Sequence, residues 1–440
     1  MTERSEGTVR RLVTRRGLIG GAAAATAATA GAAALVGCEP RRAPPAAPAF
    51  DPGSWASIKA QFPLDPDTAN FAAFVFACRL PAVRAAIDDV ASKLDRDTTS
   101  LLREEERYER AVDDAARAYL GGEPGAIAYT DSTTAGLGLL YSGLELAPGD
   151  EILTTEHDFY ATHESLRLLA ARTGVTVRTT RLYQDPAKAT EDEILTSLGA
   201  ALSPKVAVVA LTWVQLGTGV RLPVAAMADL VRSKTNALVC LDAVHGFGAR
   251  AEKPADLKVD FFASGGHKWL FGPRGTGVLW GSPAGWARYT PVIPTFDRNT
   301  IGSWITGQQF PATPGALATP GGYHTFEYRW ALAAAFDFHQ RIGADRVAER
   351  TEKLATRLKD GIAELSNVAL STPRAPALSA GIVCCSVRGL RPADAVTALR
   401  AHKVTASVTP YATELLRFGT SIATDEADVD RALQALRALS

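Results

Sequence analysis

Cysteine and methionine are scarce in this chain of 440 residues, which contains five cysteines and two methionines. Apart from Cys38, the cysteines stand at positions 78, 240, 384 and 385, where they form neither a CxxC pair nor a dense framework. This spacing excludes a zinc knuckle and a disulfide scaffold. Cys384 and Cys385 are adjacent in an apolar, strand-like run, so we expect their side chains to be buried on opposite faces of a strand.

Net charge is also absent, because 47 basic residues balance 47 acidic ones. Nothing in this balance suggests binding to nucleic acid or to a charged membrane surface. The sequence has no HExxH motif and no GxSxG motif, which argues against a zinc hydrolase and a serine hydrolase of the types that carry them. Gly275-x-Gly277-x-x-x-Gly281 suggests a nucleotide-binding oxidoreductase as an alternative, but a strand rather than the required helix is expected after it.

Long runs that are both uncharged and mainly apolar are missing except at the N-terminus, where residues 18–36 carry no charge and include ten alanines. Thr14-Arg15-Arg16-Gly17-Leu18-Ile19 matches the twin-arginine export signal, and Leu35-Val36-Gly37-Cys38 resembles a bacterial lipobox. A spanning helix is the alternative interpretation. We expect residues 1–37 to be a cleaved signal peptide, Cys38 to be lipidated, and residues 38–53 to form a proline-rich tether. The lipid would then be the only membrane contact, on the outer side of the cytoplasmic membrane.

From residue 122 onward, short apolar runs alternate with helical stretches. This pattern predicts an α/β fold with a mostly parallel sheet covered by helices on both faces. We expect a large domain over residues 54–340, including an N-terminal helical segment, and a small α/β domain over 341–440. Residues 300–322 are expected to form a long loop. The seven strands predicted for the large domain are 126–130, 151–154, 175–179, 206–211, 237–241, 260–264 and 277–280.

Polar side chains follow five of these predicted strands. Ligands bind at the carboxyl ends of strands in open parallel sheets, so these side chains are candidates for one shared site. Hydroxyls at the start of a helix suit a phosphate, although they are also ordinary N-caps. The residues after the five strands include Ser132, Thr133 and Thr134; His157; Gln215; Asp242 and His245; and Ser264, His267 and Lys268.

Lys268 stands among apolar neighbours in a turn, between His267 and Trp269. Burial lowers the pKa of an amine and makes it a nucleophile toward a carbonyl. The alternative is a lysine whose stem packs on Trp269 while its ammonium stays in water. A lysine, a carboxylate, an imidazole and a phosphate nest together are what pyridoxal phosphate requires.

These motifs resemble the class V aminotransferase family of fold-type I pyridoxal phosphate enzymes, which includes isopenicillin N epimerase and the cysteine desulfurases. The resemblance rests on Ser-Thr-Thr, Glu-His, Asp-x-x-His and Ser-Gly-Gly-His-Lys, followed by Gly-Pro-Arg-Gly-Thr-Gly. It implies that Lys268 forms the Schiff base and moves a proton at the substrate α-carbon. It also implies that Asp242 pairs with the pyridine nitrogen, that His157 stacks on the ring and that His245 hydrogen-bonds the ring oxygen.

The resemblance implies further roles. Ser132, Thr133, Thr134, Ser264 and His267 would gather the phosphate, and Gln215 would lie near the ring. Arg417 would grip the carboxylate of an amino-acid-like substrate. Alternatives from the residues alone remain: Asp242 as a turn cap, His157 as a solvated loop histidine, and Arg417 as an ion-pair partner. No metal is expected, and a homodimer is implied by the resemblance only.

Two departures from the family pattern matter. Residues 402–411, where cysteine desulfurases carry a nucleophilic cysteine, contain none, which disfavours sulfur abstraction. Ser264-Gly265-Gly266-His267 is one glycine longer than the common Ser-Gly-His motif, so the distance between Ser264 and His267 differs and the phosphate contact of Ser264 does not follow directly from the resemblance. Epimerisation or racemisation, transamination and elimination remain open as reactions, and a non-catalytic, surface-anchored binding protein is the alternative of another class.

Overall fold

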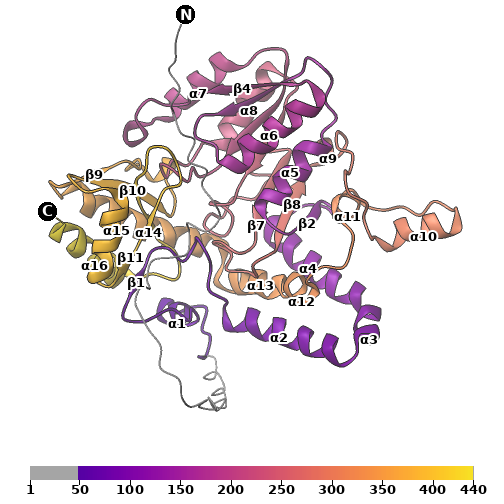
Figure 1. Ribbon diagram of the computed structural model, residues 1–440, viewed down its shortest axis with the longest axis horizontal. Helices are drawn as coiled ribbons and strands as arrows, with labels where there is room; N and C mark the ends of the chain where they lie inside the picture. The colour runs from indigo at the N-terminus through magenta and orange to yellow at the C-terminus, as the bar shows by residue number, and fades with distance from the viewer. Residues whose placement is uncertain (1–47, 440) are drawn as a thin grey trace, which may run out of the picture. The chain divides into compact units, whose positions relative to one another are not determined.

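The computed structural model describes residues 48–439 (Figure 1). The predicted signal peptide, Cys38 and most of the predicted tether lie outside the described residues. Within residues 48–439, no helix combines the length and the apolar character needed to cross a bilayer.

A seven-stranded sheet forms the centre of the fold, in the order β2-β8-β7-β6-β5-β3-β4. β8 runs antiparallel to both of its neighbours and the remaining pairs are parallel. The prediction of a mostly parallel seven-stranded sheet is confirmed. Its strands are β2 (Ile127–Thr130), β3 (Glu151–Thr155), β4 (Thr176–Thr180), β5 (Val206–Thr212), β6 (Leu238–Asp242), β7 (Phe261–Gly265) and β8 (Gly277–Gly281).

The central strands are buried on both faces because their side chains alternate between two hydrophobic clusters. Along β5, for example, Val208 and Ala210 join one cluster, whereas Val209 and Leu211 join the other. Helices α5 and α6 cover the first face, and α4, α7, α8 and α13 cover the second. A sheet covered in this way leaves only its edges and strand ends open to a ligand.

The helices from the N-terminus through the sheet region are α1 (Trp55–Ala60), α2 (Pro81–Arg96), α3 (Thr98–Arg103), α4 (Glu105–Leu120), α5 (Thr133–Gly143), α6 (Tyr160–Thr173), η2 (Pro186–Lys188), α7 (Glu191–Ala201), α8 (Val224–Lys234) and α9 (Pro283–Trp286). The helices that follow are α10 (Arg298–Thr306), α11 (Pro314–Ala318), α12 (Phe326–Trp330), α13 (Leu332–Ile342) and α14 (Ala344–Ala363). On α8, buried Val224, Met227, Ala228 and Val231 follow the spacing of one helix face.

The C-terminal region contains a four-stranded antiparallel sheet in the order β12-β13-β10-β9, and a short parallel pair, β1 with β11. Its side chains form a separate hydrophobic cluster with α14, α15 and α16. The predicted boundary at residues 340–341 falls inside α13, and the two-domain division stays a prediction. The elements are β1 (Ala69–Asn70), β9 (Val368–Leu370), η3 (Pro376–Leu378), β10 (Ile382–Val387), α15 (Pro392–Ala401), β11 (Val404–Thr405), β12 (Ser407–Val408), β13 (Leu416–Gly419) and α16 (Glu426–Ala438).

Cys384 and Cys385 are both fully buried, as predicted, and belong to different hydrophobic clusters. Cys384 faces the cluster beneath the large sheet, and Cys385 faces the core of the C-terminal region.

The expectation of one long loop over residues 300–322 is wrong. The segment contains the end of α10 and all of α11. Asp297 caps the N-terminus of α10 by accepting from Thr300 N–H, and Gly307 ends the helix in the left-handed conformation. These capping residues were the local signal, and the glycine- and proline-rich composition of the segment concealed it. Figure 1 shows α10 projecting away from the sheet.

Candidate active site

The polar residues after the five strands lie at one edge of the sheet, because β2, β3, β5, β6 and β7 all run in the same direction. Thr212 and Asp242 are direct neighbours at the ends of β5 and β6. Thr133 Oγ1, at the start of α5, accepts a 2.7 Å hydrogen bond from the N–H of Gly265 at the end of β7. The sheet therefore brings together segments that lie 132 residues apart in sequence.

Lys268 projects from a tight turn between β7 and β8. Gly266 N–H donates to Thr276 O, and Gly272 N–H donates to Gly266 O, each at 2.8 Å. A Cβ on Gly272 would lie 2.8 Å from Gly266 O, so the crossing requires glycine. Phe271 adopts a positive φ of 55°, which is uncommon for an aromatic residue. The backbone of the turn is thus held in one shape, and its shape fixes where Lys268 begins.

Lys268 is mostly buried, and its amine has no hydrogen bond or ion pair with another described residue. Burial lowers its pKa, the positive charge of Arg417 lowers it further, and Asp242 opposes both. A larger fraction of this amine is neutral near pH 7 than for an exposed lysine, which is the condition for nucleophilic attack. The alternative of a stem with a fully hydrated ammonium does not fit this environment.

Asp242 ends β6 and is 1% exposed. Burial raises its pKa to about 7, against a 3.1 Å hydrogen bond that its Oδ1 accepts from Val244 N–H. The nearby Asp158 raises the pKa further, whereas Lys268 lowers it. The Val244 bond shows that Asp242 does cap the turn, as the alternative interpretation held. One cap leaves most of the carboxylate's hydrogen-bonding capacity open to a cationic partner.

His157 follows β3 and stacks on Tyr183, with ring centroids 4.2 Å apart and planes inclined by 7°. Burial lowers the pKa of His157, so the ring is neutral at pH 7, and its Nε2 has no partner among the described residues. Tyr183 OH donates to Gln215 Oε1 and also contacts Thr218 Oγ1 at 3.0 Å. Tyr183 therefore positions both His157 and Gln215. Its role was missed in the sequence because a single tyrosine 26 residues away from His157, outside any motif, gives no signal.

His245 is 2% exposed, and its Nδ1 accepts a 3.1 Å hydrogen bond from the indole N–H of Trp269. Burial, together with the positive charges of Lys268 and Arg417, lowers its pKa well below the usual value. His245 is therefore neutral across the physiological range, and it lies close enough to Lys268 for the charge of the lysine to oppose protonation of the imidazole.

The proposed phosphate contacts differ in what they offer. Ser132 Oγ accepts from Ala135 N–H as the N-cap of α5, and Thr133 Oγ1 accepts from Gly265 N–H. Both hydroxyl protons remain available for a phosphate. Thr134 is exposed in the first turn of the same helix. Ser264 is fully buried and donates to Gly265 O at 3.3 Å, so its phosphate contact stays a prediction.

Arg417 lies in β13 of the C-terminal sheet and is 5% exposed. Its Nε donates to Ser407 Oγ at 3.0 Å, its guanidinium lies 5.0 Å from the ring centroid of Phe74, and its Nη1 has no partner among the described residues. Burial lowers its pKa. No carboxylate pairs with it, so the alternative of an ion-pair partner is not observed within residues 48–439.

Several buried polar atoms at this edge of the sheet, and one on β13 of the C-terminal sheet, have no partner among the described residues. They are His157 Nε2, Asp158 Oδ1, Thr212 Oγ1, Gln215 Nε2, His267 Nδ1 and Arg417 Nη1. Buried polar groups are almost always hydrogen-bonded, and leaving one unpaired costs about 1–3 kcal/mol. Donors and acceptors of this kind fit a polar ligand that carries a phosphate and a ring nitrogen. The residues present therefore fit pyridoxal phosphate, on evidence independent of any sequence pattern.

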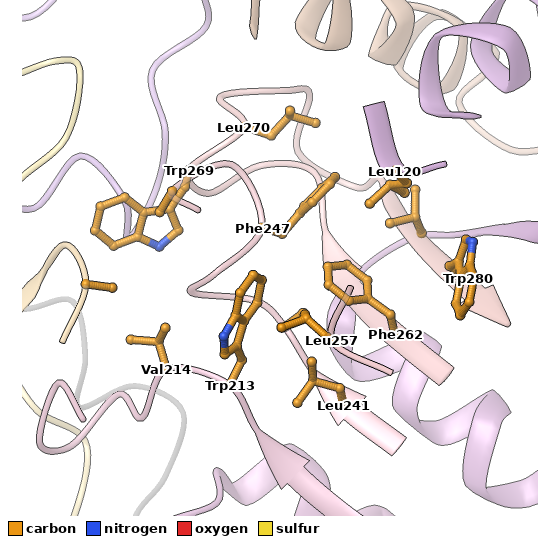
Figure 2. Packing of buried hydrophobic residues seen from close by; sticks show 14 of the residues in the cluster. Leu120, Trp213, Val214, Leu241, Phe247, Leu257, Phe262, Trp269, Leu270 and Trp280 are labelled. Atoms are coloured by element: carbon orange, nitrogen blue, oxygen red, sulfur yellow. The ribbon is translucent and has the colours of Figure 1, made fainter. Parts of the chain in front are cut away.

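Buried aromatic residues pack beside the loops that follow the strands. Figure 2 shows Trp213, Phe247 and Trp269, which belong to three different strand-end loops, in one buried cluster. Of the aromatic residues that flank the strand ends in sequence, Trp213 packs against Gly246 inside the core and cannot contact a substrate. Tyr160 and Tyr323 are exposed by 68% and 82%. Phe74, between Arg417 and Trp269, lies within the site.

A cavity of about 580 Å³ opens beside the end of β2 and the start of β8. Its wall includes Thr130 and Asp131, the start of β8 at Gly277, and Arg329. Neither Lys268 nor any of the proposed phosphate contacts lines it, although Asp131 and Ala135, which do, flank residues 132–134 in sequence. Arg329 forms a 2.9 Å ion pair with Glu109 and approaches His324 Nε2 at 3.3 Å.

The model of the aminotransferase class-V family matches residues 82–431. The chain is 26% identical to the isopenicillin N epimerase of Amycolatopsis lactamdurans over 88% of its own length and 99% of that protein. It is 27% identical to a probable cysteine desulfurase of Halalkalibacterium halodurans, over 68% and 71% of the two chains.

Solved structures show the same fold at lower sequence identity. A C-DES mutant with glycine covalently linked to its pyridoxal phosphate cofactor superimposes with a TM-score of 0.79 at 23% identity, over 87% of this chain and 99% of that one. The cysteine desulfurase of Thermococcus onnurineus gives 0.75 at 21%, over 87% and 97%. With the family model spanning both the large sheet and the C-terminal sheet, this chain belongs to the class V aminotransferase family and is a pyridoxal phosphate-dependent enzyme.

Proposed function

We propose that the enzyme acts at the α-carbon of an amino acid or amino-acid-like amine, and that epimerisation or racemisation is its reaction. The observation that carries this proposal is the amine of Lys268, a mostly buried side chain with no hydrogen-bond partner among the described residues, whose pKa burial and the charge of Arg417 lower. Pyridoxal phosphate, when bound, supplies an aldehyde for covalent attachment and a ring that accepts the electrons released at the α-carbon.

Lys268 would hold the cofactor in the resting enzyme and, once released, take a proton from the α-carbon and return one. Its lowered pKa suits both steps, since a general base works best when its pKa lies near the working pH. Asp242 would hold a proton on the pyridine nitrogen, and His157 would pack on the ring face with Tyr183 behind it. His245, kept neutral, would hydrogen-bond the ring oxygen.

Arg417 would bind the substrate carboxylate. Its Nε is held by Ser407, which leaves the two terminal nitrogens for a bidentate pair. Phe74 stacks under the guanidinium and limits its movement. A carboxylate held at this point would restrict the orientation of the substrate in the site, and positioning of this kind supplies part of the rate enhancement of enzymes.

Sulfur abstraction is disfavoured on the environment of the cysteines. Cys384 is the described cysteine next to Arg417, with which it pairs in the C-terminal sheet. It is fully buried, and burial raises the pKa of its thiol to about 12. A thiol of this kind supplies too little thiolate to attack sulfur. Among the remaining reactions, the similarity to isopenicillin N epimerases over 88% of the chain favours epimerisation.

Solvent deuterium exchange tests this function. We expect purified, cofactor-loaded enzyme to exchange the α-proton of its substrates in deuterium oxide and to convert one α-configuration into the other. A screen of amino acids and peptide-like amines, followed by NMR and chiral chromatography, measures both. Exchange without inversion would point to transamination or elimination, which release an oxo acid or a split product. Absence of exchange with every amine tested would contradict the proposal.

We also propose that the enzyme is a homodimer that uses the segment around α10. Trp304 and Ile305 on α10 are 85% and 68% exposed, and Phe296 before the helix is 56% exposed. An exposed apolar group of this size is typical of a contact surface. We expect the wild-type enzyme to sediment as a dimer and Trp304→Asp to shift it toward monomer, whereas Leu168→Asp, at a 45% exposed residue on α6, leaves the dimer intact. A monomeric wild type would contradict the proposal.

We propose in addition that the enzyme is exported already folded and is anchored by Cys38. The twin-arginine pathway carries folded proteins, which fits a cofactor acquired in the cytoplasm. Replacing Arg15 and Arg16 by lysine should leave the precursor in the cytosol, and Cys38→Ser should release an exported, soluble form. Recovery of a fully cofactor-free precursor from the cytosol would count against folding before export.

A further inference from the structure

Trp269, the residue after Lys268, does more than fill space. Its indole N–H donates a 3.1 Å hydrogen bond to Nδ1 of His245, in surroundings where both side chains are almost fully buried. The indole nitrogen is a donor only, so the Nδ1 that receives this bond carries no proton. The single proton of a neutral His245 must then reside on Nε2.

The environment of His245 keeps it neutral. Lys268 and Arg417, the charged groups that act on it, are both cationic and oppose a second proton on the imidazole. Among the described residues, His245 Nε2 has no hydrogen-bond partner. The imidazole therefore presents one N–H, in one tautomer, as a donor that remains available.

Packing fixes the indole that imposes this tautomer. Phe74 stacks on Trp269 with centroids 4.9 Å apart and planes inclined by 17°. On the side of β10, a Cβ on Gly381 would come within 2.6 Å of the indole ring. Gly248, with a φ of 83°, brings the segment after His245 against the Trp269–Leu270 backbone, where a Cβ would lie 2.5 Å from Leu270 N. Both partners of the hydrogen bond are thus held by their surroundings.

We propose that Trp269 is a positioning residue that locks His245 as an Nε2–H donor to the ring oxygen of the bound cofactor. The proposal rests on the cofactor site described above, but its central statement concerns a tautomer that exists in the cofactor-free protein. A donor to this oxygen stabilises its anionic form. It therefore lowers the pH at which the covalently attached cofactor changes its visible absorbance.

The tautomer can be read in the cofactor-free wild type by NMR with 15N-labelled histidine. Comparison with His245→Ala assigns the signals of His245. We expect a protonated Nε2 and an unprotonated Nδ1 over the whole range in which the protein is folded. A proton on Nδ1, or a mixture of both tautomers, would overturn the proposal, and this readout does not depend on catalysis or on any variant of Trp269.

A second measurement asks whether Trp269 acts through His245. Trp269→Phe retains a ring for Phe74 and removes the N–H. We expect a tautomer mixture in the cofactor-free variant and an upward shift of the absorbance midpoint by about half to one pH unit, a threefold to tenfold change that corresponds to one hydrogen bond. In a His245→Ala background the same substitution should leave the midpoint unchanged. A shift of equal size in both backgrounds would reduce Trp269 to packing and refute the proposal.

Discussion

Lys268, which is mostly buried, and Lys359, which is fully buried, are two lysines with lowered pKa values and different surroundings. Lys359, on α14, is 1% exposed, and its ammonium donates to Pro373 O, Arg374 O and Ser379 Oγ at 3.1, 2.9 and 2.5 Å. Burial lowers its pKa to about 8. Lys268 also has a lowered pKa, yet none of the described residues accepts a hydrogen bond from it.

Because both lysines have lowered pKa values but only Lys359 has acceptors, burial alone does not identify a catalytic lysine. Three acceptors satisfy the three donors of the Lys359 ammonium, so this lysine ties the segment before β10 to α14. Lys268 lies among buried polar atoms that also lack partners, such as His157 Nε2 and Arg417 Nη1. Lys268 differs from the structural Lys359 because neither its amine nor several polar atoms of the same site have a hydrogen-bond partner among the described residues.

Replacement of Lys268 should have the largest effect on turnover, with little effect on stability. We expect Lys268→Ala to lower turnover by at least about 10⁴-fold, because it removes both the nucleophile and the proton carrier. Its thermal unfolding should stay close to that of the wild type, since no hydrogen bond is lost. Steady-state kinetics and calorimetry measure the two effects. Turnover within tenfold of wild type would contradict the assignment.

Asp242 should make the stability of the cofactor-free protein depend on pH. In the cofactor-free protein its pKa is raised to about 7, against about 4 in the unfolded chain, so the folded state binds more protons between these values. Stability from this group is present below pH 4 and is lost as pH rises to 7, by up to about 4 kcal/mol. Denaturant unfolding of the cofactor-free enzyme should show this fall, and Asp242→Asn should abolish it. A stability that rises over the same range in the wild type alone would contradict the burial of the carboxyl.

Lys359→Met should act on stability and not on chemistry. The methionine retains the apolar stem but leaves the buried acceptors unpaired, so we expect a loss of about 1–3 kcal/mol in the free energy of unfolding. Cofactor binding and the visible absorbance should remain. Loss of the cofactor from a folded Lys359→Met enzyme would remove the distinction between the two lysines.

Arg417 tests substrate binding, apart from cofactor attachment and folding. Arg417→Lys retains the charge but loses the bidentate geometry, and we expect KM for the substrate to rise about 10- to 100-fold with a smaller change in kcat. Ser407→Ala, which frees only Nε, serves as the matched control and should change KM less. An unchanged KM in Arg417→Lys would argue that the substrate carboxylate binds elsewhere.

The sequence was sufficient to predict the sheet and the convergence of its strand ends. Apolar runs such as that of β5 predict strands from local pattern alone. Because parallel strands run in the same direction, the polar residues that follow them lie at one edge of the sheet. Lys268, Asp242 and His157 lie where this reasoning predicts. Their roles toward the cofactor remain predictions that the experiments above test.

Tertiary contacts were not readable in the same way. The stacking of Tyr183 on His157 and the hydrogen bond from Trp269 to His245 join residues 24 to 26 positions apart, and no periodicity marks them. Trp213 adjoins a strand end in sequence but turns into the core. The helix α10 was missed because the glycine, proline and threonine residues around it are typical of a loop. The caps at Asp297 and Gly307 nevertheless define a helix between them.

Reduction with borohydride followed by peptide mass spectrometry tests the central claim most directly. The reagent fixes a covalently held pyridoxal phosphate to the lysine that carries it. We expect loss of the visible absorbance and a single modified peptide, labelled at Lys268. A colourless, unlabelled protein after supplementation with the cofactor, or a label at Lys359 with Lys268 free, would contradict it.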